Sequence, residues 1–270
     1  MKTRVLSSML AIPIVLALTY FGNIWFLALM IFGSVLAAYE LSNFLAQKKI
    51  RTTPLLSAFI SGSLVLTGFI LAKLDMNSIA FPLGISILSL ASVAILPLFT
   101  PRTPTIFTNL LISITAGVYV GGLLCFAPLL REGPNGLEWT LYLFVTITLT
   151  DSGAYAVGKT IGRTPFFPKI SPSKTLEGAL GGLIFGVIGS LLSVHFLEIK
   201  TVTLIESSVT GLILSSCAQI GDLYESLLKR KSGVKDSGRL LPGHGGALDR
   251  LDSIVFSLCV LYYFTQWIST

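Results

Sequence analysis

The chain has 270 residues, of which 53% are hydrophobic and only 12% are charged, and its mean hydropathy is +0.81. This composition excludes an ordinary soluble domain and predicts an all-α integral membrane protein. The net charge is +6, but in a membrane protein the distribution of bases among the loops is more informative than their sum. The cysteines Cys125, Cys217 and Cys259 lie in apolar runs without metal-ligand spacing, so we expect reduced thiols.

The hydropathy pattern predicts a polytopic protein with about nine transmembrane helices. The apolar runs lie near residues 5–21, 23–42, 55–72, 77–99, 106–130, 138–157, 176–197, 202–226 and 248–268. We expect about five spans in residues 1–135. The remaining residues, 136–270, should form a catalytic region of about four spans with cytoplasmic loops at 159–175 and 229–247.

The lysines and arginines fall mainly on one side of this predicted arrangement. If the N-terminus is inside, sixteen of the nineteen bases lie on the inner side, and only Lys73, Arg131 and Lys200 lie on the other. Cytoplasmic loops carry such an excess, so the pattern predicts a cytoplasmic N-terminus and an external C-terminus. The expected location is the cell inner (cytoplasmic) membrane, with the most charged loops facing the cytoplasm.

Two spans carry glycines repeated every four residues. Gly117 and Gly121 lie on the fifth span, and Gly178, Gly182 and Gly186 lie on the seventh. We expect these positions to serve close helix packing, because small residues let helix backbones approach one another in membranes.

A first polar patch interrupts the apolar sequence at residues 150–178. Asp151 lies inside the sixth span and Tyr155 follows one turn later, while Ser171, Ser173 and Thr175 are candidate N-caps for the seventh helix. Lys174 would lie at the entrance of that helix, and a helix N-terminus beside a lysine can bind an anion. The alternative is a capped helix behind a basic loop, with no ligand.

A second polar patch, residues 222–252, contains five of the thirteen acids, six of the nineteen bases and five glycines. Carboxylates bind cations, bases bind phosphates and glycines let the backbone approach a ligand, so this composition predicts a site for metal and phosphate.

The lengths of the flanking apolar runs place acids at the membrane boundary. Residues 254–267 and 207–221 are each shorter than the roughly 20 residues that a span needs. The last span must therefore begin near Leu248 and include Asp249 and Asp252, and the preceding span must continue through Asp222. Ionisable residues in such positions indicate function.

The second patch resembles the phosphatidate cytidylyltransferase (CDP-diacylglycerol synthase) family. The family pattern spans 27 residues here, from Ser226 to Asp252, and fifteen positions match. The matches are Ser226, Lys229, Arg230, Lys235, Asp236, Gly238, Leu241, Pro242, Gly243, His244, Gly245, Gly246, Asp249, Arg250 and Asp252.

The first patch is similar to two further motifs of the same family. One covers 151–162 and the other Ile170 to Gly178, where Ser173 replaces a usual lysine and leaves one phosphate-facing base fewer. The N-terminal half matches only in hydropathy and in Glu40, which follows the second span.

The resemblance implies that CTP and phosphatidate react to give CDP-diacylglycerol and pyrophosphate at the cytoplasmic face of the bilayer. It implies Mg²⁺, with a second cation left open, and no nucleic acid. A homodimer is one option for the oligomeric state. Asp222 and Asp249 are the expected ligands of the catalytic metal, with Asp252 and Asp151 as further metal candidates.

The other expected site residues bind phosphate or substrate. The catalytic candidates are Lys229, Arg230, Lys235, Asp236, His244 and Arg250, and the substrate-binding candidates are Lys174, Ser171, Ser173, Arg239, Gly243, Gly245, Gly246 and Tyr155. We expect His244 to hydrogen-bond a phosphate oxygen rather than to act as a base.

Two other functions compete with this interpretation. A CTP-dependent lipid-alcohol (polyprenol) kinase would share the nucleotide, the metal and the membrane, but it needs a base to deprotonate its alcohol. A cation-coupled transporter would also bury acids in its spans, but such sites lie near the bilayer midplane and often in repeated halves, which this sequence does not show.

Overall fold

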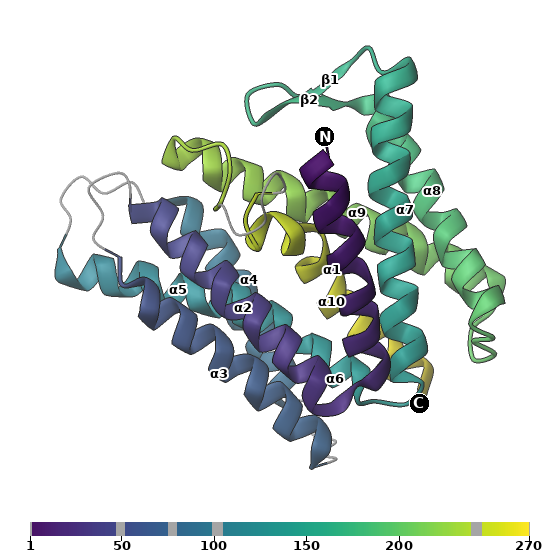
Figure 1. Ribbon diagram of the computed structural model, residues 1–270, viewed down its shortest axis with the longest axis horizontal. Coiled ribbons are helices and arrows are strands. Elements are labelled where there is room, and N and C mark those ends of the chain that lie inside the picture. The colour runs from purple at the N-terminus through teal and green to yellow at the C-terminus, as the bar shows by residue number, and fades with distance from the viewer. Residues whose placement is uncertain (1, 47–51, 75–79, 99–104, 239–244, 270) are drawn as a thin grey trace. The chain divides into compact units, whose positions relative to one another are not determined.

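The computed structural model describes residues 2–46, 52–74, 80–98, 105–238 and 245–269, and most of these residues are helical (Figure 1). The α-helices are α1 Lys2–Phe21, α2 Asn23–Leu45, α3 Pro54–Lys73, α4 Ala80–Ile95, α5 Ile106–Leu124, α6 Phe126–Arg131, α7 Gly136–Ile161, α8 Leu176–Phe196, α9 Leu204–Ser232 and α10 Leu248–Ser269. A short 3₁₀ helix, η2, covers Leu96–Leu98.

One small hairpin departs from the predicted all-α fold. Strands β1 (Pro165–Phe167) and β2 (Ser171–Thr175) pair antiparallel between α7 and α8. Helix α8 begins only at Leu176, so Ser171 and Ser173 lie too far before it to cap it, and their predicted role as N-caps is wrong. Thr175 is the N-cap of α8, because its side chain accepts a hydrogen bond from the Gly178 backbone at 3.2 Å.

Seven stretches of the described chain are long and apolar enough to cross a membrane. They are α2, α3, α4 with η2, α5 with α6, α8, α9 and α10. A polytopic helical membrane protein is thus confirmed. The count of nine spans and the orientation of the N-terminus stay predictions.

The chain divides into two compact units. Unit 1 comprises Met1–Leu137 and Leu227–Leu251, and unit 2 comprises Glu138–Ser226 and Asp252–Thr270. The predicted division into residues 1–135 and 136–270 concerned membrane spans, and it stays a prediction.

In unit 1, helix α3 packs against α2 and α5. Gly117 and Gly121 of α5 face the backbone of Ser57 and Ser61 on α3, where a β-carbon would clash. The Ser57 hydroxyl donates to the Ser113 carbonyl at 2.8 Å across the same contact. The predicted packing role of this glycine pair is confirmed.

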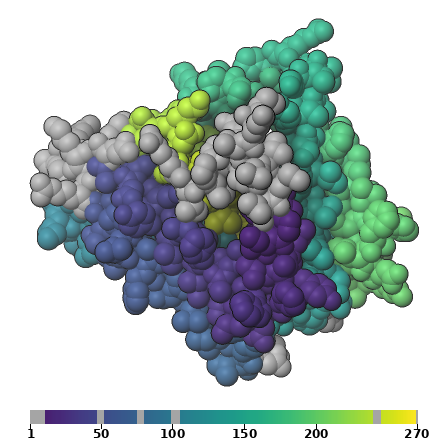
Figure 2. Space-filling view, in the orientation of Figure 1, coloured from purple at the N-terminus to yellow at the C-terminus, as the bar shows by residue number. Residues whose placement is uncertain are grey.

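The outer surface of unit 1 is apolar, as a surface in contact with lipid should be. Figure 2 shows α1 and α2 in purple on one face. Large apolar side chains at the turn between these helices are more than half exposed: Tyr20, Phe21, Ile24 and Trp25. Exposure on this scale is unusual for a soluble monomer and suits a bilayer.

In unit 2, α8 packs closely against α7 and α9 through its glycines. Gly182 lies against Ala154 of α7 and Gln219 of α9, and Gly186 lies against Thr150 and Ser215. The hydroxyls of Thr150 and Ser215 are 2.9 Å apart. The packing prediction is confirmed for this span too, and the contact positions the polar ends of α7 and α9.

Helices α9 and α10 have the extents that the short apolar runs in the sequence predicted. Helix α9 continues through Asp222 to Ser232, and α10 begins at Leu248, so that Asp249 and Asp252 lie in its first turns. Within unit 2, Gly221 meets the Asp252 carbonyl where a β-carbon would clash, and the Tyr224 and Phe256 rings are 5.9 Å apart. The polar ends of α9 and α10 therefore pack together.

Candidate active site

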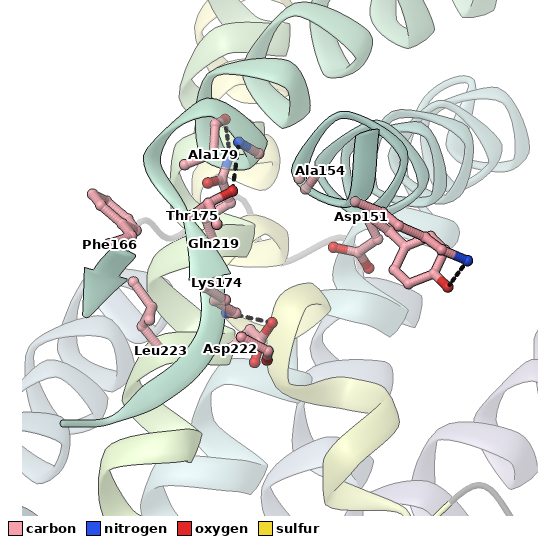
Figure 3. Close-up of a pocket in the computed structure, with 14 residues that line it drawn as sticks. Asp151, Ala154, Phe166, Lys174, Thr175, Ala179, Gln219, Asp222 and Leu223 are labelled. Atoms are coloured by element: carbon pink, nitrogen blue, oxygen red, sulfur yellow. Dashed lines mark hydrogen bonds and ion pairs between the residues drawn. The ribbon is translucent and has the colours of Figure 1, made fainter. Parts of the chain in front are cut away.

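Unit 2 contains a pocket of about 490 Å³ at the polar ends of α7, α8 and α9 (Figure 3). Its walls come from α7, the β1–β2 hairpin, the start of α8 and the polar end of α9. The lining residues are Asp151, Ala154, Tyr155, Gly158, Lys159, Phe166, Ser173, Lys174, Thr175, Gly178, Ala179, Gln219, Asp222 and Leu223.

An ion pair between β2 and α9 forms one wall of this pocket. Lys174 Nζ lies 2.5 Å from Asp222 Oδ2, and the two side chains are 29% and 34% exposed. Figure 3 shows the pair beside Leu223, with Asp151 on α7 forming another wall. Two carboxylates and two lysine ammonium groups, with Lys159 as the second lysine, therefore line one cavity, a combination that suits a phosphate ligand with a cation.

The hairpin that carries Lys174 is attached to the first turn of α8. Glu177 accepts hydrogen bonds from the backbone N–H of Arg163 at 3.0 Å and of Thr164 at 3.1 Å, and from the Thr164 hydroxyl at 2.8 Å. The negative charge at a helix N-terminus is favourable, and these bonds fix the start of the hairpin. Lys174 is thus presented by a short, anchored strand.

Gln219 is a pocket residue that the sequence did not single out. It lies on α9 one turn before Asp222, and its side-chain amide donates to the Ala179 carbonyl at 3.1 Å. The bond ties α9 to α8 beside Asp222. The sequence did contain a signal for this residue: Gln219 lies three positions before Asp222, and residues i and i+3 share a helix face.

Unit 1 contains a second cluster, centred on Asp249. Asp249 Oδ1 lies 2.6 Å from Lys229 Nζ, and Oδ2 accepts from the backbone N–H of Gly246 at 2.8 Å and of Ser237 at 3.2 Å. The side chains of Lys229 and Asp249 are only 12% and 13% exposed. The carboxylate therefore fixes both the lysine and the backbone of the loop.

Glu40 of α2 completes this second cluster. Its Oε2 accepts from the Ser237 hydroxyl at 3.2 Å and from the Leu248 backbone N–H at 3.1 Å, and the residue is 9% exposed. The sequence identified Glu40 only as a family match without a role. A buried acid near the end of an apolar span was the signal.

The remaining predicted residues are distributed over both units. Arg230, Lys235, Asp236 and Arg250 are exposed. Asp252 is buried, and its Oδ1 accepts from the Ser253 backbone N–H at 2.7 Å. Ser171 is half-buried in β2, and Tyr155 and Ser173 line the pocket of unit 2. Gly245 has a φ of 82°, a left-handed conformation that suits glycine.

Three predicted residues lie outside the described part of the chain: Arg239, Gly243 and His244. Their assignments stay predictions. The three cysteines are free thiols, as expected.

Among the described residues, no three histidine, cysteine, aspartate or glutamate side chains gather as a ready metal site. The donor chemistry nevertheless fits Mg²⁺, which commonly binds one or two carboxylates together with substrate phosphates and water. Asp151 and Asp222 offer such oxygens in the pocket of unit 2.

Comparison with known proteins gives a consistent result over nearly the whole chain. A family model described as "Cytidylyltransferase family" matches residues 2–268. Proteins named phosphatidate cytidylyltransferase from Staphylococcus aureus (strain COL) and Bacillus subtilis (strain 168) are each 36% identical to this chain. One from Staphylococcus saprophyticus is 34% identical. The alignments cover 97% of this chain and 97% of each relative.

Proposed function

Because the chain belongs to the cytidylyltransferase family, we propose that it transfers the cytidylyl group of CTP to phosphatidate. An oxygen of the lipid phosphate attacks the α-phosphorus of CTP. The bond from that phosphorus to the oxygen bridging the α- and β-phosphates breaks. The products are CDP-diacylglycerol and pyrophosphate, so phosphorus, oxygen and charge are conserved.

The pocket of unit 2 is the observation that best supports this proposal. It combines Lys174, Asp222 and Asp151 in about 490 Å³ at the ends of membrane helices. The reaction joins two polyanions, and at an effective dielectric of about 20 the repulsion between two charges 4 Å apart is about 4 kcal/mol. Lys174 would lower this repulsion by binding a phosphate in place of Asp222.

The attack itself requires no general base. Phosphatidate is a phosphomonoester whose second pKa is about 6, so at neutral pH its attacking oxygen is already deprotonated. The protein must therefore position and neutralise phosphates rather than move a proton. The candidate phosphate ligands are Lys174, Lys229, Arg230, Lys235, Arg239 and Arg250, with His244 as a hydrogen-bond partner of phosphate.

Carboxylates on both patches are the candidate Mg²⁺ ligands. Asp222 and Asp249 are the principal candidates, with Asp151 and Asp252 as further ones. Bound Mg²⁺ would neutralise charge on the phosphates and orient them. Asp222 and Asp249 are each held by a lysine, through Lys174 and Lys229 respectively. Each ion pair keeps a carboxylate and a phosphate-binding base oriented before substrate arrives.

The finer membrane arrangement is part of the same proposal. Nine spans, with α1 and α7 added to the seven long apolar helices, would place the N-terminus and the charged loops in the cytoplasm. CTP would then reach the site from the cytoplasm, at the inner membrane of the cell. Phosphatidate would arrive from the bilayer.

The lipid-alcohol kinase is the less favoured alternative. The family model and the relatives' names both specify cytidylyl transfer. A kinase would also need a base to deprotonate its alcohol, a requirement that attack by the phosphatidate oxygen does not have.

The test is an acceptor comparison with purified protein in liposomes. CTP is supplied with phosphatidate or with a polyprenol, and CDP-lipid and pyrophosphate are measured. We expect equal amounts of both products with phosphatidate and none with the polyprenol. Phosphorylated polyprenol and CDP as the products would reject the proposal.

A further inference from the structure

We infer that Glu40 is a positioning residue, which ties Ser237, after α9, to Leu248, at the start of α10, so that Asp249 and Lys229 keep their geometry. This inference rests on the proposed function for its effect on rate. The structural part can be measured without substrate.

Glu40 lies on α2 and contacts two residues that are far from it in sequence. Its Oε2 accepts from the Ser237 hydroxyl at 3.2 Å and from the Leu248 backbone N–H at 3.1 Å. Ser237 follows the end of α9 at Ser232 by five residues, and Leu248 is the first residue of α10. One carboxylate from a third helix therefore links the segment after α9 to the start of α10.

The bond to Leu248 also stabilises the start of α10. The first N–H groups of a helix lack intrahelical partners, and a negative charge beside them is favourable. Glu40 supplies that acceptor from another helix, and Asp249 supplies a second acceptor, to Gly246, from within α10. The position of α10's first turn, and with it the Asp249 carboxylate, thus depends on Glu40.

The backbone at Gly238 and at Gly246 packs directly against the Glu40 carboxylate. A β-carbon on Gly238 would lie 2.5 Å from Glu40 Cδ, and all three nearest atoms to it belong to Glu40. A β-carbon on Gly246 would meet Glu40 and Ser237. Glu40 is buried and hydrogen-bonded. Its carboxylate could therefore make room for an alanine methyl group at these glycines only by breaking its bonds to Ser237 and Leu248.

Ser237 couples the two carboxylates of this cluster. Its hydroxyl donates to Glu40, and its backbone N–H donates to Asp249 Oδ2 at 3.2 Å. Loss of Glu40 would release the Ser237 side chain and the Leu248 N–H together. Asp249 would then keep its bond to the Ser237 N–H only through a residue whose side chain is no longer fixed.

The first test compares Glu40→Ala with Glu132→Ala by hydrogen exchange in nanodiscs without substrate or metal. Glu132 is a matched control, since it is an acid of unit 1 that bonds Lys73 and the Asn23 backbone away from the loop. We expect exchange in residues 245–251 to rise about tenfold in Glu40→Ala, because a buried N–H loses its acceptor, and not to rise in Glu132→Ala. Equal exchange in both variants would overturn the inference.

The second test uses conservative variants and rate constants. Glu40→Gln retains an amide oxygen that can accept from both the Ser237 hydroxyl and the Leu248 N–H, so we expect it to keep kcat within about threefold, whereas Glu40→Ala loses at least about tenfold in kcat. KM for CTP should change less than kcat. If Glu40→Gln is as slow as Glu40→Ala, the charge rather than the geometry is required, and the inference fails.

A double-mutant cycle with Gly238→Ala tests the contact itself. Gly238→Ala should reduce kcat about tenfold when Glu40 is present, and less than about twofold in the Glu40→Ala background, where the methyl group has room. If the two substitutions change kcat independently, the contact between Gly238 and Glu40 is rejected. If the unaltered protein makes no CDP-lipid, the proposed function fails instead. The hydrogen-exchange data still test, without any substrate, whether Glu40 fixes the start of α10.

Discussion

Asp249→Asn should reduce stability and activity together, whereas Asp222→Asn should reduce activity alone. Asp249 faces Lys229 at 2.6 Å with both side chains under 14% exposed, so the variant puts a neutral amide in place of the carboxylate beside a largely buried ammonium group. Breaking such a pair costs about 3–5 kcal/mol. Asp222 and Lys174 are about a third exposed, so their pair contributes at most about 1 kcal/mol.

These free energies convert into a measurable difference in thermal unfolding. For a chain of this size, Tm falls by about 2–4 °C per kcal/mol. We expect Asp249→Asn to unfold about 6–20 °C below the unaltered protein, and Asp222→Asn within about 4 °C of it. Tryptophan fluorescence during heating in detergent micelles measures both. Each variant should lose at least about 100-fold in cytidylyl transfer, because a neutral amide binds Mg²⁺ poorly.

A compensating variant separates the two effects. Lys229→Met in the Asp249→Asn background removes the ammonium group that faces the neutral amide, so most of the lost Tm should return while activity stays low. Equal Tm losses in Asp222→Asn and Asp249→Asn, or no recovery in the double variant, would refute this reasoning.

Three further predictions concern topology, His244 and the packing of α8. In a background without the native cysteines, cysteine at the exposed position of Lys231 should react only with membrane-permeant reagents in intact cells, and cysteine at Thr270 with impermeant ones; labelling from the same side would mean an even number of spans. His244→Gln should keep clearly more activity than Asp249→Asn and retain the acid limb near pH 6, which the substrate phosphate sets; loss of that limb would make the histidine a proton-transfer group. Gly186→Val should lower the folded yield and Tm, because a β-carbon there meets Thr150 and Ser215; an unchanged Tm would contradict the close contact.

The helical membrane fold and the ends of its last two helices could be predicted because hydropathy and length determine them. The apolar run after Asp252 was too short to span a bilayer, which required α10 to begin near Leu248, and it does. The same argument extended α9 through Asp222. Small-residue spacing likewise predicted the contacts of Gly117, Gly121 and the α8 glycines.

The parts that could not be predicted depend on contacts between residues far apart in sequence. Three residues offered an N-cap for α8, and only the start of the helix at Leu176 assigns that role to Thr175. Glu40 lies 197 positions before Ser237, so its bond to the loop has no local sequence signal. The Lys174–Asp222 pair likewise needs the hairpin to bring β2 to α9. Residue types predicted the chemistry of the site, whereas tertiary packing sets its pairings.

The position of isotopic label in the product tests the central claim most directly. The purified protein in phosphatidate-containing liposomes would be given CTP labelled in either the α- or the γ-phosphate, with Asp222→Asn as the inactive control. Cytidylyl transfer predicts that the α-label enters the lipid and the γ-label leaves as pyrophosphate. Recovery of the γ-label in the lipid and the α-label in CDP would contradict it and identify a kinase.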